Sequence, residues 1–96
     1  MSHHGLRRGS SHDLDRYLRL AAHAANLTRL TGRIAEVSHH SRTHRGLQLR
    51  AACTAYDQTL LLAATELGIE TGLRTPLSAV DRLMLEAELV AAGLRW

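Results

Sequence analysis

Two histidines at helical spacing are the clearest candidates for chemistry in this sequence. His40 and His44 stand four residues apart, so on one helical face their imidazoles could share a transition metal, with His39 or Glu36 near enough to contribute. No cysteine pair and no HExxH motif completes the site, and this spacing arises by chance in a chain with seven histidines. A metal or haem site at His39, His40 and His44 is therefore one hypothesis, and a solvated polar stretch is the plainer one.

The charge of the first half of the chain suggests contact with nucleic acid. All twelve basic residues are arginine, which we attribute to coding bias in a GC-rich genome because alanine, leucine and glycine are abundant too. Residues 1–50 carry a net charge of +6 and residues 51–96 one of −3. Arginines in this basic half could neutralise phosphates.

The candidate phosphate contacts are Arg7, Arg8, Arg29 and Arg33. A helix running unbroken as far as residue 45 would place Arg29 and Arg33 on one face with the histidines at 40 and 44, while Arg7 and Arg8 precede it. Glu36 interrupts that face, and the aromatic residues that stack on single strands are scarce. A nucleic-acid-binding or regulatory protein that uses this basic half is therefore the alternative function, and a solvated basic face is the plainer interpretation.

Catalysis has no support in the sequence. Cys53 lies within an apolar stripe, where a buried thiol is hidden from substrate and inert. Glu86 and Glu88 are two residues apart and point to different sides of a helix, so they do not form a carboxylate pair. The sequence also contains no glycine-rich phosphate loop. The sequence therefore favours a protein without catalysis and leaves enzymatic activity open.

The composition indicates a small helical protein of the reducing cytoplasm. A length of 96 residues fits one domain with a thin core, and leucine and alanine dominate its apolar residues. A single cysteine excludes an intramolecular disulfide. We expect a soluble protein because no apolar run is long enough to span a membrane and no signal peptide is evident.

The apolar spacing predicts a first helix over about residues 13–40, after a flexible basic tail over residues 1–12. Ser10 and Asp13 favour a helix start, and the tail is too polar to form a core. The apolar positions lie on one face up to Leu27 and on a rotated face from there to Val37. Gly32 is near this change and suggests a kink or a new packing partner. The His3-His4 pair could be left from an expression tag.

A second helix over about residues 47–69 has the clearest pattern. One apolar stripe runs from Leu49 to Leu67 at spacings of three and four residues, and a second strip includes Leu47, Leu62 and Ile69. This helix should therefore contact structure on two sides. Arg42, Arg45 and Gly46 suit the end of the preceding helix, so we place the reversal between residues 39 and 47.

A third helix is predicted over about residues 79–93. Ser78 and Asp81 form a variant capping box, and Gly93 is placed to close the helix. Its apolar positions suggest a buried face, and the charged positions suggest a solvated one. The residues expected to be buried are Val80, Leu83, Met84, Ala87, Val90, Ala91 and Leu94, and those expected in solvent are Asp81, Arg82, Glu86 and Glu88.

Short connections between these helices predict an all-α, three-helix antiparallel bundle with a long helical hairpin. Three helices of leucine and alanine bury little area, so we expect dimerisation to complete the bundle. The predicted function is that of a protein–protein interaction or oligomerisation module, a homodimer or the partner of another helical protein. Its expected interface residues are Leu49, Tyr56, Leu60, Leu83 and Val90.

Overall fold

The described residues form three helices and no strand, which confirms the all-helical prediction. In this computed structural model the backbone is described for residues 3–40 and 45–96, and the side chains for residues 12–39 and 46–96. The helices are α1 (His3–His40), α2 (Arg45–Glu66) and α3 (Ala79–Ala91). Among the described residues, no helix is long and apolar enough to cross a membrane.

Helix α1 is longer than the sequence predicts. It begins at His3, about ten residues before the expected start, and continues through Gly32. A Cβ atom added at Gly32 would meet nothing within 4 Å, so no neighbouring element approaches the backbone closely at this glycine. The proposed flexibility of residues 1–12 remains a prediction.

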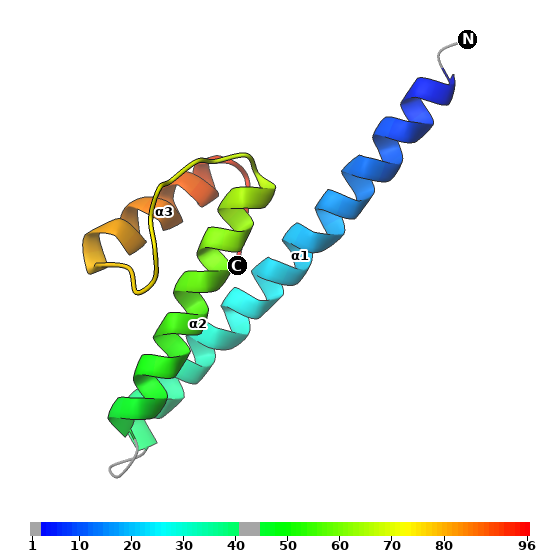
Figure 1. The fold of residues 1–96 in the computed structure, drawn as a ribbon. Helices are drawn as coiled ribbons and strands as arrows, with labels where there is room; N and C mark the ends of the chain where they lie inside the picture. The colour runs from blue at the N-terminus through cyan, green and yellow to red at the C-terminus, as the bar shows by residue number, and fades with distance from the viewer. Residues whose placement is uncertain (1–2, 41–44) are drawn as a thin grey trace.

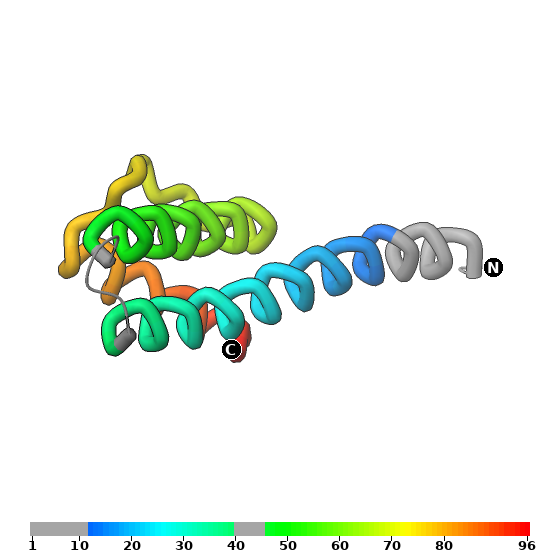
Figure 2. Tube along the Cα trace, turned by 90° about the horizontal axis from the view of Figure 1, so that it is seen from below, coloured from blue at the N-terminus to red at the C-terminus, as the bar shows by residue number. Residues whose placement is uncertain are grey.

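Helix α2 begins at Arg45, so this arginine and Gly46 belong to the start of α2 rather than to the end of α1. The chain turns back between α1 and α2, which lie side by side (Figure 1). Figure 2 shows the blue part of α1 extending beyond both other helices. Helix α2 contacts α1 and α3 and is therefore the central helix, as the sequence predicts.

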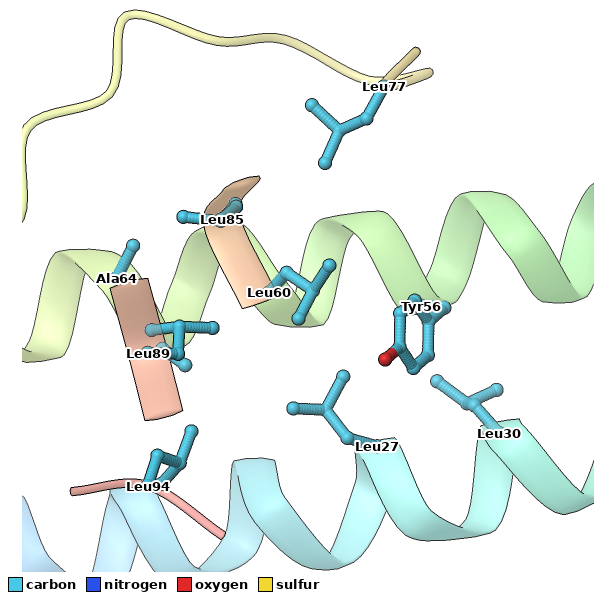
Figure 3. Packing of buried hydrophobic residues seen from close by; sticks show 10 residues of the cluster. Leu27, Leu30, Tyr56, Leu60, Ala64, Leu77, Leu85, Leu89 and Leu94 are labelled. Atoms are coloured by element: carbon cyan, nitrogen blue, oxygen red, sulfur yellow. The ribbon is translucent and has the colours of Figure 1, made fainter. Parts of the chain in front are cut away.

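The core lies where α1, α2 and the segment around α3 meet (Figure 3). Leucines and alanines supply nearly all of it. Its members are Leu27, Leu30, Tyr56, Leu60, Ala63, Ala64, Leu77, Leu85, Leu89 and Leu94. At roughly 1.5–3 kcal/mol for each large apolar side chain that leaves water, these residues hold α2 against both neighbours.

Local signals fix both ends of α3. The Ser78 hydroxyl accepts a hydrogen bond from the Asp81 N–H at 3.1 Å, so the predicted N-cap is confirmed. At the other end Gly93 has a φ of 104°, which glycine adopts without strain. The Leu94 N–H donates to the Leu89 carbonyl at 3.0 Å and the Gly93 N–H to Val90, as in a Schellman motif.

Candidate interaction surfaces

Helix α3 faces the opposite way from the sequence prediction. Its buried residues are Leu85 and Leu89, whereas Val80, Leu83, Met84 and Val90 are between 43% and 67% exposed. These four residues and Ala87, which is likewise exposed and likewise predicted to be buried, thus form an apolar stripe on the outside of the molecule. Of the predicted buried residues of the α3 region, only Leu94 joins the core. We call Val80, Leu83, Met84, Ala87 and Val90 the α3 outer face.

The cause of this rotation is a buried carboxylate on α2. Asp57 is fully buried, and Arg82 of α3 donates to it through Nε at 2.6 Å and through Nη2 at 2.9 Å. The backbone N–H of Leu77 donates to the same carboxylate at 3.0 Å. Its hydrogen bond to Asp57 raises the pKa of the Arg82 guanidinium. A carboxylate held by three donors can stay buried, and it draws Arg82 inward.

The hydroxyl of Tyr56 on α2 also binds the side of α3 that faces the core. The Tyr56 hydroxyl donates a hydrogen bond to Glu86 of α3 and accepts one from the Trp96 indole N–H at 3.2 Å. Burial, reinforced by the hydrogen bond to Glu86, raises the pKa of Tyr56 to about 12. Arg82 and Glu86, both expected in solvent, therefore face α2, and the apolar side chains of α3 turn outward.

The α3 outer face has an acidic rim. By the 100° step of an α-helix, Asp81 and Glu88 lie on one edge of the stripe, and Glu86 lies on the other, where its carboxylate accepts the hydrogen bond from Tyr56. Glu88 is exposed and Asp81 is half-buried. A helix packed on this face would gain from basic residues beside its apolar contacts, because opposite charges favour docking and like charges disfavour it.

A second exposed apolar stripe lies on the part of α1 that extends beyond the core. Leu14, Tyr17 and Leu18 are 55–67% exposed, and Ala21 and Ala25 continue the stripe towards the middle of the helix. The buried residues of α1 begin at Leu27, on another face. The apolar residues of α1 thus lie on two different faces, as the sequence predicts. Within the described structure, no other element packs on the first of these faces.

A shallow groove adjoins this stripe. It has a volume of about 390 Å³ and lies between α1 and the residues that follow α3. Tyr17 and Ala21 of the stripe line it on one side, and Leu94 and Arg95 on the other. Its lining is mostly apolar, so it extends the apolar surface of α1 sideways.

The predicted interface residues divide between core and surface. Tyr56 and Leu60 are buried in the chain's own core, which removes them from an interface with another molecule. Leu49 is half-buried on α2. Leu83 and Val90 are exposed on the α3 outer face.

The candidate metal and nucleic-acid residues are placed only in part. His39 is exposed near the end of α1, and His40 is its last residue; the side chain of His40 and all of His44 lie outside the described part. Within the described ranges no group of three or more histidine, cysteine, aspartate or glutamate side chains could hold a metal ion.

Arg29 and Arg33 are exposed on α1, and the Arg29 guanidinium donates to the Asn26 side-chain oxygen at 2.6 and 3.1 Å. The side chains of Arg7 and Arg8 lie outside the described part. Helix α1 is described as far as His40, and the proposed alignment of these arginines with His40 and His44 involves side chains outside the described residues.

Cys53 is half-buried rather than fully enclosed. It lines a hollow of about 250 Å³ with Thr31, Ile34, Tyr56 and Arg82. No histidine or carboxylate lines this hollow, so no base stands beside the thiol there.

Comparisons with protein-family models, with curated proteins and with solved structures found no match to this chain.

Proposed function

We propose that this protein is a non-catalytic, helical protein–protein interaction module that docks a partner helix on the α3 outer face. The observation that carries the proposal is the outward rotation of α3. Four large apolar side chains of α3 are exposed to solvent, whereas Arg82 and Glu86 of the same helix form hydrogen bonds with Asp57 and Tyr56 of α2. Contiguous apolar patches rimmed by polar residues are typical of interaction sites.

The spacing within the α3 outer face suits a helical partner. Val80, Leu83, Ala87 and Val90 follow one another at steps of three, four and three residues, the pattern of a coiled-coil seam. The acidic rim favours a partner that is amphipathic and basic. The same rim disfavours pairing of α3 with α3 of a second copy, because the two sets of carboxylates would meet.

Homodimerisation, the other part of the predicted function, is favoured by a separate observation. By the 100° step of an α-helix, the exposed Asp15 and Arg29 lie along one edge of the α1 stripe and of its continuation along the helix, so this edge carries both charges. A face with both charges at its edge can pair with a copy of itself. The protein would then act as a dimer that displays two α3 outer faces.

The docking proposal is tested by comparing two variants as bait in extract from the source cells. Leu83→Glu with Val90→Glu changes the α3 outer face, and Leu47→Glu with Leu62→Glu changes two exposed leucine side chains of α2 instead. We expect a protein that binds the wild type and the α2 variant but not the α3 variant. After its identification, the purified protein should bind the α3 variant at least tenfold more weakly in a calorimetric titration, because apolar contacts are lost and like charges are added.

All of the exchanged side chains are exposed, so both variants should keep the helix content of the wild type in circular dichroism. Binding partners that do not distinguish the α3 variant from the α2 variant would contradict the proposal.

A further inference from the structure

We propose that two copies of this chain pair through α1, antiparallel, with Asp15 of each copy opposite Arg29 of the other. The inference rests on the proposed function and names the surface and the register of the homodimer. It starts from the α1 stripe, whose three large side chains are exposed.

The stripe continues as a regular seam along the described part of α1. Leu14, Leu18, Ala21, Ala25, Thr28 and Gly32 follow one another at alternating steps of four and three residues, and all six are exposed. By the 100° step of an α-helix, the seam lies roughly 140° around the axis from the buried Leu27. A second helix can therefore pack on the seam without displacing α2.

The seam has large residues at its N-terminal end and small residues along the rest of its length. Its first two positions are leucines and its later positions are small, and a Cβ atom added at Gly32 would meet nothing within 4 Å. In an antiparallel pair, Leu14 packs over Gly32 of the second copy, Leu18 over Thr28, and Ala21 over Ala25. Each leucine then lies on a small residue, and the alanines at the centre permit a close approach of the two helices.

The charges beside the seam select the same register. Asp15 and Arg29 lie on the same edge of the seam, are both exposed, and stand at equivalent heptad positions. In antiparallel coiled coils these edge positions face each other, so this register brings each Asp15 to an Arg29 of the other copy. Within the chain Arg29 contacts only the neutral Asn26 among the described hydrogen bonds, which leaves its charge available.

A parallel pair of α1 helices would match neither the residue sizes nor the charges of the two copies. It would place leucine beside leucine at one end and glycine beside glycine at the other. It would also leave Asp15 and Arg29 about 21 Å apart along the axis, at the 1.5 Å rise per residue.

Cysteine cross-linking tests the register directly. In a Cys53→Ala background, which removes the only cysteine, Ala21→Cys and Ala25→Cys are prepared as two full-length proteins and mixed in equal amounts under mild oxidation. The antiparallel register brings position 21 to position 25 of the other copy, so mass spectrometry should find the mixed disulfide dimer well above the half that random pairing gives. Equal or greater yields of the two like-with-like dimers would overturn the proposal.

Charge exchange tests the pairing of Asp15 with Arg29. Asp15→Arg or Arg29→Asp alone should weaken self-association roughly two- to thirtyfold in sedimentation equilibrium, since two ion pairs are lost per dimer, and the double exchange should restore it. If these variants leave the dimer intact while Leu83→Glu dissociates it, the α1 pairing is wrong and the interaction function stands. If the wild type does not dimerise, the α1 pairing is wrong and the bait comparison decides docking at α3 separately.

Discussion

The carboxylate of Asp57 determines which side of α3 meets the core. It has no solvent exposure, and its donors come from Arg82 and from the Leu77 backbone just before α3. A buried carboxylate without donors is strongly unfavourable, so α3 must present Arg82 to α2. The exposed apolar stripe on the other side of α3 is the consequence.

Replacing Asp57 by alanine should destabilise the fold by about 2–4 kcal/mol. This loss of stability is smaller than for a fully buried ion pair, because the Arg82 side chain is 30% exposed and keeps some hydration. Urea unfolding measures the free energy. As the control, Arg19→Ala removes the exposed ion pair of Arg19 with Glu66, and it should cost less than about 1 kcal/mol. Similar losses for both variants would contradict the role of Asp57.

Tyr56 gives the protein a specific sensitivity to alkaline pH. The pKa of Tyr56 is about 12 in the fold, against about 10 for an unfolded tyrosine. The folded state therefore favours the neutral phenol, and this contribution is complete below pH 10 and lost as the pH rises towards 12. Unfolding measured along this range should show a loss of up to roughly 2 kcal/mol in the wild type that Tyr56→Phe lacks. Equal pH profiles for the two proteins would argue against this.

At the scale of elements, the ends of α3 follow from adjacent residues and its orientation does not. Ser78 and Gly93 act on backbone groups within a few residues of themselves, so the sequence predicts both ends of the helix. The orientation depends on Asp57, twenty or more residues away along the chain. Apolar periodicity alone predicts that the wider apolar side of α3 faces the core. In the structure, the hydrogen bonds that Tyr56 and Asp57 of α2 make with α3 turn the opposite side inward.

Gly93→Ala should destabilise the protein by about 1 kcal/mol or more. Gly93 has a φ of 104°, a conformation that costs an alanine energy. Gly46→Ala is the matched control, because Gly46 lies in a right-handed helical turn and no atom lies within 4 Å of an added Cβ. That substitution should leave stability unchanged or raise it by up to about 1 kcal/mol. Thermal unfolding measures the stability of both variants. If Gly93→Ala is as stable as the wild type, the backbone conformation at this position does not require glycine.

At the scale of the whole molecule, the chain is elongated, with principal extents of 64 × 24 × 17 Å. The sequence indicates more apolar helix surface than one chain can bury, and the structure locates that surface on α1 and on α3. The expected interface residues Tyr56 and Leu60 are instead core, because the stripe on α2 is covered by α1 and α3 of the same chain. Sequence periodicity identifies a stripe, and only the packing decides what covers it.

We propose that this surplus apolar surface joins the chain to other molecules, first to a second copy of itself. Sedimentation equilibrium of the full-length protein over a dilution series is its most direct test. The chain mass is 10.6 kDa. We predict a species of twice that mass at high concentration that dissociates on dilution. A single species of the chain mass at every concentration would contradict self-association.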